Sequence, residues 1–153
     1  MIKKILVGFI FALSILFITG CSEQEKIKVK KNNKTVEKSN EVIKYMKIEI
    51  NNKEYSINLE ENETTKKLIE LLPLELNMDE LNGNEKFAYL DTNLPTNSYS
   101  PKHINAGDVM LFGNNCLVIF YKSFDTTYNY TKIGHIDNLS DLGKNNVKVI
   151  FKK

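Results

Sequence analysis

The alternation of hydrophobic and polar residues predicts a β-hairpin near the middle of the first half of the chain. Met46, Ile48 and Ile50 alternate with charged residues, which is the period-2 pattern of a half-buried strand. The turn-forming segment 51–53 follows, and the same alternation resumes over residues 55–59. These two runs therefore predict a pair of antiparallel strands.

A change of period directly after the hairpin predicts one helix. Asn62 is a favourable helix N-cap, and Glu63 next to it suits the positive end of the helix dipole. Residues 65–72 carry an apolar stripe on one helical face, and Pro73 ends the pattern. We expect a helix of about ten residues that packs against a sheet.

The remainder of the chain predicts further strands. Apolar runs bounded by turn residues favour strands at 74–78, 86–90, 109–112, 116–121, 130–136 and 147–151. Between them we expect a loop at 79–85, a long irregular segment at 91–106 and a helical turn at 139–142. The complete pattern predicts a mainly β fold, a closed or nearly closed barrel of about eight strands with one short packed helix.

The first 20 residues have the pattern of a secretion signal. Lys3 and Lys4 precede an apolar run over 5–17, which is shorter than the about 20 residues of a membrane span but typical of a signal peptide. The segment 18–21 resembles the bacterial lipobox, in which an aliphatic and two small residues precede a lipidated cysteine. This resemblance implies cleavage before Cys21 and a diacylglyceryl group on its sulfur. An uncleaved anchor helix is the alternative.

A lipid on Cys21 would fix where the protein works. Two acyl chains give stable anchoring where one does not, so we expect the protein on the outer face of the cell membrane, with the membrane as a partner. Residues 22–44 have many charges and no aromatic side chain, which predicts a disordered tether. Its lysines either adhere to anionic headgroups or form a solvated spacer.

The expected organisation of the chain is a signal at 1–20, the lipidated cysteine and tether at 21–44, and one domain at 45–153.

The charges exclude one class of partner. All 21 basic residues are lysines, so the chain has no guanidinium for bidentate recognition of carboxylate or phosphate groups. Residues 45–153 carry twelve lysines and fifteen acidic residues, a net charge of −3. A nucleic-acid-binding domain needs a basic face, so we expect no nucleic acid as a partner.

Several motifs occur in an order that resembles a known family. They are the hairpin, the helix before Pro73, the segment 85–90, the turn 107–108 before an apolar strand, the segment 119–121 and the segment 130–136. Together they resemble the small bacterial cyclophilin-like domain family over residues 45–153. The resemblance implies a compact cyclophilin-type barrel of eight strands with a helical cover, and it implies a fold more than an activity.

The same resemblance raises the question of prolyl isomerase activity. True cyclophilins use an Arg and a Gln in their groove, whereas this chain has no Arg and its one glutamine, Gln24, precedes the domain. A lysine is a poor geometric substitute for the group that polarises the prolyl nitrogen. We therefore expect a non-catalytic module that binds an exported peptide or protein, or a small ligand. The alternative is a prolyl isomerase for exported proteins.

The candidate groove residues are aromatic or histidine side chains near the ends of predicted strands. They are Tyr89, His103, Phe112, Tyr128, Tyr130 and His135. The alternative is that most of the aromatic residues belong to the core or wall of the barrel. No His or Cys spacing suits a zinc site, so we expect neither a metal nor a cofactor.

Other reactive residues have simple structural interpretations. Cys116 begins a very apolar strand and is expected to be an inert core thiol, although a Cys–His–Asp arrangement stays open. Asp108 follows a glycine and is expected to accept hydrogen bonds from local backbone N–H groups. An enzyme that uses Glu85, Asp108 or His135 is a third class of function.

Overall fold

A computed structural model describes residues 43–153, which belong to one compact unit. The predicted signal segment and Cys21 lie outside the described residues. In this part of the chain, no helix combines the length and the apolar character that a membrane span requires.

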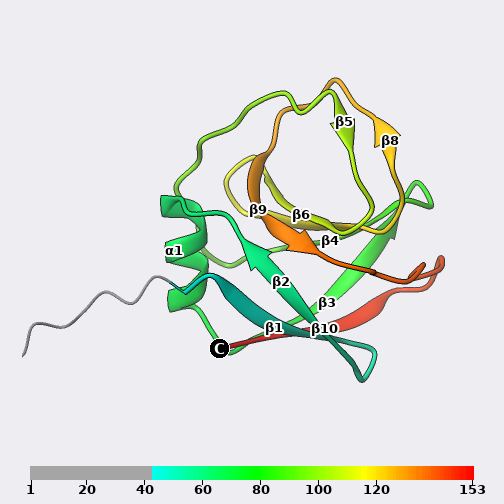
Figure 1. The fold of residues 1–153 in the computed structure, drawn as a ribbon, viewed down its shortest axis with the longest axis horizontal. Coiled ribbons are helices and arrows are strands. Elements are labelled where there is room, and N and C mark those ends of the chain that lie inside the picture. The colour runs from blue at the N-terminus through cyan, green and yellow to red at the C-terminus, as the bar shows by residue number, and fades with distance from the viewer. Residues whose placement is uncertain (1–42) are drawn as a thin grey trace, which may run out of the picture. The chain divides into compact units, whose positions relative to one another are not determined.

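Eight antiparallel strands close into a barrel (Figure 1). Around the barrel they follow the order β1-β10-β3-β4-β7-β6-β9-β2. Their bounds are β1 Tyr45–Ile50, β2 Lys53–Leu59, β3 Leu74–Leu81, β4 Glu85–Tyr89, β6 Asp108–Phe112, β7 Cys116–Phe120, β9 Thr131–Ile136 and β10 Val147–Lys152. The closed barrel confirms the fold class that the sequence predicts.

Two short strands lie outside the barrel wall. β5 (His103–Ile104) and β8 (Phe124–Asp125) pair with each other in a separate two-stranded sheet, which Figure 1 shows beyond β6 and β9. β5 lies in the segment 91–106 that was expected to be irregular, and no element was predicted at β8, because two residues are too few to show any periodicity. This small sheet covers part of the outer face of the barrel.

The one helix of the described residues, α1 (Glu63–Glu70), begins where the sequence predicts. The side chain of Asn62 accepts a hydrogen bond from the backbone N–H of Thr65 at 2.9 Å, which confirms its role as the N-cap. Leu68 is completely buried on the face that meets the barrel. The helix ends at the C-cap Leu71, so it is two residues shorter than expected.

Two expectations about the connections were wrong. β3 continues to Leu81, because residues 79–81 pair with residues 85–87 of β4, and the expected loop at 79–85 shrinks to a tight turn. The helical turn expected at 139–142 is absent, and that segment is irregular. The longer β3 follows from its hairpin pairing with β4.

Alternate residues of the central strands pack into two separate cores. Val109, Leu111 and Ile119 point into the barrel, whereas Met110 and Val118 point outward beneath the β5–β8 layer. The second core explains why β7 is apolar on both faces. It also means that part of the outer wall of the barrel is an apolar surface.

A buried lysine of β4 is bonded to the irregular segment before β10. Lys86 is completely buried, and its Nζ donates hydrogen bonds to the backbone oxygens of Gly143 at 2.6 Å and Asn145 at 2.8 Å. The ring of Tyr121 lies 4.9 Å from the same Nζ. The two hydrogen bonds attach the irregular segment before β10 to β4.

Each barrel strand pairs with two neighbours, and the unit has its own hydrophobic core. Those are the properties of a domain that folds without help from another part of the chain. Soluble fragments that keep residues 43–153 are therefore suitable for solution experiments.

Candidate functional site

A cavity of about 490 Å³ opens on the outer face of the barrel, and we call it the aromatic groove. This volume lies within the roughly 300–1,000 Å³ of small-molecule sites. The groove is lined by residues from β3 and β4, from β6 and β7, and from the segment that contains β8. Its lining residues are Leu81, Asn82, Asn84, Glu85, Phe87, Tyr89, Phe112, Cys116, Val118, Phe124, Asp125, Thr126, Thr127, Tyr128 and Tyr130.

The alternation of β4 presents one set of side chains to this groove. Glu85, Phe87 and Tyr89 point outward because Lys86 and Ala88 point into the barrel. The floor is buried and apolar, since Val118 and Cys116 are 3% and 6% exposed. The groove is thus a direct product of strand periodicity together with the second, outer core.

The rim carries aromatic rings that remain exposed to solvent. Tyr89 is 66% exposed and Tyr128 is 63% exposed. The ring of Phe112 lies 5.9 Å from that of Tyr128, edge to face, and 5.6 Å from that of Tyr130. Such contacts hold the rings in defined orientations.

One acidic side chain stands among these rings. Glu85 is half-buried, and its burial raises the pKa of the carboxyl group to about 7, with a further contribution from the charge of Glu80. Burial likewise raises the pKa of the Cys116 thiol to about 11, so this lining thiol is protonated at neutral pH. The lining residues include no histidine that could activate it.

Four of the six predicted groove residues line this one cavity: Tyr89, Phe112, Tyr128 and Tyr130. His103 lies beside it, because its Nδ1 is 2.7 Å from Oδ1 of Asp125, a lining residue. His135 lies elsewhere on the barrel. Tyr130 also fits the alternative that aromatic residues belong to the core or wall of the barrel. It is 5% exposed and packs in the outer core as well as lining the groove.

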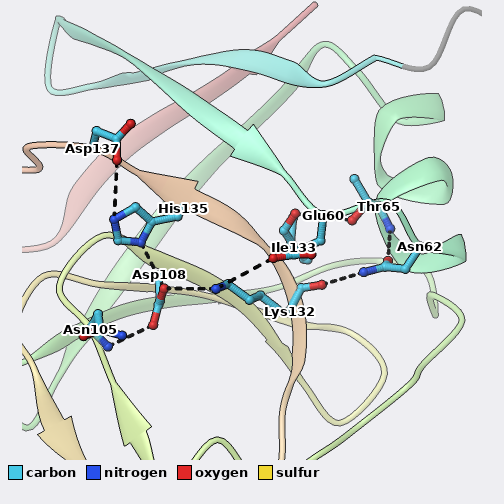
Figure 2. A network of polar contacts seen from close by, with 9 residues as sticks. All are labelled: Glu60, Asn62, Thr65, Asn105, Asp108, Lys132, Ile133, His135 and Asp137. Atoms are coloured by element: carbon cyan, nitrogen blue, oxygen red, sulfur yellow. Dashed lines mark hydrogen bonds and ion pairs between the residues drawn. The ribbon is translucent and has the colours of Figure 1, made fainter.

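His135 belongs to a polar cluster around Asp108, which we call the Asp108 network (Figure 2). The side chain of Asp108 is 3% exposed, and its Oδ1 lies 3.0 Å from Nδ1 of His135 and 3.8 Å from Nζ of Lys132. Its Oδ2 accepts a hydrogen bond from the backbone N–H of Asn105 at 2.9 Å, as the sequence predicts. Lys132 extends the cluster to Glu60, with an Nζ to Oε1 distance of 3.8 Å.

A glycine allows this network to close. Gly107 has a φ of +100°, and a Cβ at this position would lie 2.3 Å from the backbone oxygen of Ile136 and 2.9 Å from the His135 ring. The turn therefore approaches β9 closely enough to place Asp108 against His135. Figure 2 shows the carboxylate between the imidazole and the Lys132 ammonium.

The Asp108 network joins separate parts of the fold. Within residues 43–153, the partners of the His135 ring are the carboxylates of Asp108 and Asp137, and no hydroxyl or thiol is among them. In the same range, no group of three or more His, Cys, Asp or Glu residues is placed to hold a metal ion. Its contacts connect the turn before β6 with β9 and with the segment before α1.

Sequence reasoning missed part of the groove. Phe87 and Asp125 line it but were not among the candidates, and Glu85 was considered only as a catalytic residue. The period-2 pattern of β4 could have found Phe87, because it shares a face with Tyr89. Asp125 belongs to β8, for which the sequence has no comparable signal.

Comparison with known proteins identifies the family. The sequence profile of the cyclophilin-like family matches residues 48–152, which is nearly the whole described domain. Searches of curated proteins and of solved structures each give no match to the chain. The match covers more than half of the chain and includes most of the barrel, so the chain belongs to the cyclophilin-like family.

Proposed function

We propose that this protein is a non-catalytic binding module that takes a peptide or small ligand in the aromatic groove. The observation that carries the proposal is the combination of a buried apolar floor with exposed Tyr89 and Tyr128 rings at the rim. Exposed aromatic side chains around an apolar hollow are typical of ligand sites.

The proposed place of work is the outer face of the cell membrane. The lipobox-like segment 18–21 supports a lipid anchor on Cys21, with residues 22–44 as the tether. The test is metabolic labelling with a fatty acid analogue. The native chain should carry the label in the membrane fraction, and Cys21→Ser should lose it. Equal labelling of both chains would contradict the anchor.

Binding in the groove is tested with the neutral, environment-sensitive dye Nile red and a soluble fragment of residues 22–153. Tyr89→Ala should weaken dye binding about fivefold or more, because it removes a ring that touches the ligand. Tyr45→Ala is the matched control, since Tyr45 is also 66% exposed but lies on β1 outside the groove. Equal affinities of these two variants, or no dye binding by the native fragment, would contradict the proposal.

Prolyl isomerase activity is the alternative that the family fold favours. A protease-coupled assay with a proline-containing peptide distinguishes the two functions. We expect the rate with the fragment to equal the uncatalysed rate, because the chain has no arginine to polarise the prolyl nitrogen. A clear acceleration that Tyr89→Ala abolishes would replace the binding proposal with the enzymatic one.

A further inference from the structure

The Glu85 carboxylate is the feature of the aromatic groove that a neutral apolar ligand would leave unused. It begins β4, opposite Phe120 of β7, and its side chain lies in the wall of the cavity. Within residues 43–153, only burial and the like charge of Glu80 act on it, and no hydrogen bond or ion pair compensates its charge. Removing a carboxylate from water without a partner is unfavourable, so this position favours a ligand that supplies the partner.

The charges around the groove have one sign. Its charged lining residues are Glu85 and Asp125, and no lysine is among the lining residues. The nearest lysine in sequence, Lys86, points into the barrel and donates to two backbone oxygens. Lys122 is paired with Asp141, at 3.5 Å between Nζ and Oδ2. The described residues therefore leave the positive partner to the ligand.

A further observation agrees with a cationic ligand. The rings of Phe87, Tyr89 and Phe112 line the same cavity, and the faces of such rings attract ammonium groups.

We propose that the aromatic groove selects ligands that carry an ammonium group on an apolar stem, with the ammonium against Glu85 and the stem between the aromatic rings. This inference rests on the proposed function and names its ligand class. A lysine side chain of a peptide and a free alkylamine share this chemistry. Anionic ligands are disfavoured, because both charged lining residues are acidic.

The test compares matched probes by NMR titration of the fragment of residues 22–153. N-acetyl-lysine methylamide and N-acetyl-norleucine methylamide have similar stems and differ in the ammonium group. We expect the lysine probe to bind about tenfold more tightly, and Glu85→Gln to reduce this preference to about twofold or less. Glu75→Gln is the control, because Glu75 is an exposed carboxylate of β3 paired with Lys148 outside the groove.

The same titration carries a pH readout. The titratable groups that interact with Glu85 are Glu80 from β3, Cys116 from β7 and Tyr130 before β9, and Asp125 from β8 lines the same cavity. Affinity for the lysine probe should rise up to about tenfold from pH 6 to pH 8 as Glu85 ionises, and Glu85→Gln should remove this rise. A parallel series in His103→Gln separates any contribution of the histidine bonded to Asp125.

Each result has one meaning. Equal affinities for the lysine and norleucine probes, or a preference that survives Glu85→Gln, would overturn the inference. If Nile red still binds in that case, the proposed binding function remains and only the ligand class is wrong. If neither the dye nor the probes bind, the proposed function fails as well. Hexylamine identifies the source, since tighter binding of hexylamine than of the lysine probe indicates a free amine.

Discussion

Two acidic residues begin the two strands that flank β7, and their surroundings differ. Asp108, at the start of β6, has a histidine, a lysine and a backbone N–H group within reach of its carboxylate. Glu85, at the start of β4, has aromatic rings beside it and no positive partner within the described residues. Both strands pair with β7 in the same barrel wall, so the difference comes from the side chains and turns around each carboxylate.

Under the proposed function, Asp108 is a structural carboxylate and Glu85 is a ligand-binding one. A buried charge with its partners in place stabilises the fold, and removing it leaves those partners without compensation. A half-buried charge without partners destabilises the fold and persists where a function uses it. Substitutions at the two positions should therefore change the free energy of unfolding in opposite directions.

The largest expected effect is at Asp108. Asp108→Ala should lower the free energy of unfolding by about 3 kcal/mol, because it removes a buried carboxylate from His135 and Lys132. Urea denaturation measures the change. Glu54→Gln, which removes an exposed partner of Lys47, is the control and should leave the midpoint unchanged. If Asp108→Ala and Glu54→Gln have similar urea denaturation midpoints, Asp108 does not stabilise the fold more than an exposed carboxylate does.

A smaller loss is expected at Lys86, the neighbour of Glu85 on β4 that points the other way. Lys86→Met should lower the free energy of unfolding by about 2 kcal/mol, because the backbone oxygens of Gly143 and Asn145 lose their donor. Hydrogen exchange should show faster exchange in the segment before β10. Unchanged exchange there would show that Lys86 does not hold this segment.

The smallest effect has the opposite sign and belongs to Glu85. The pKa of Glu85 is about 7 in the folded protein, above the ordinary 4.5. Below pH 4.5 the side chain is protonated and does not lower the free energy of unfolding. As the pH rises through 7 the carboxyl group ionises in its half-buried position, and the free energy of unfolding falls. Glu85→Gln should therefore stabilise the protein by about 1 kcal/mol at pH 8, a value reduced for solvent screening, and by nothing at pH 4.5. Thermal unfolding at both pH values measures this, and destabilisation at pH 8 would show that Glu85 has a structural partner.

Local patterns in the sequence predicted most of the barrel. The hairpin of β1 and β2, the N-cap Asn62 and the two-faced apolar run of β7 each depend on residues close in the chain. The strands β5 and β8 were missed, because each has two residues and exists only through its pairing with the other. The periodicity of either segment does not predict this long-range pairing.

The candidate site was harder to predict for the same reason. Aromatic residues near strand ends indicated part of the groove, but the hydrophobic pattern does not say which polar residues will lack partners. Lys86 is completely buried although lysines are usually exposed, and Glu85 beside it has no positive partner within the described residues. His135 was assigned with the aromatic residues, whereas its register opposite Asp108 places it in the Asp108 network.

The most direct test of the account is one NMR titration of the fragment of residues 22–153 with N-acetyl-lysine methylamide, because it reports on both carboxylate regions at once. We predict that the amide shifts of Glu85, Tyr89, Phe112 and Tyr128 change with a common affinity, while those of Asp108 and His135 stay constant. Shifts that concentrate around Asp108 and His135 instead would contradict the assignment of the aromatic groove as the binding site.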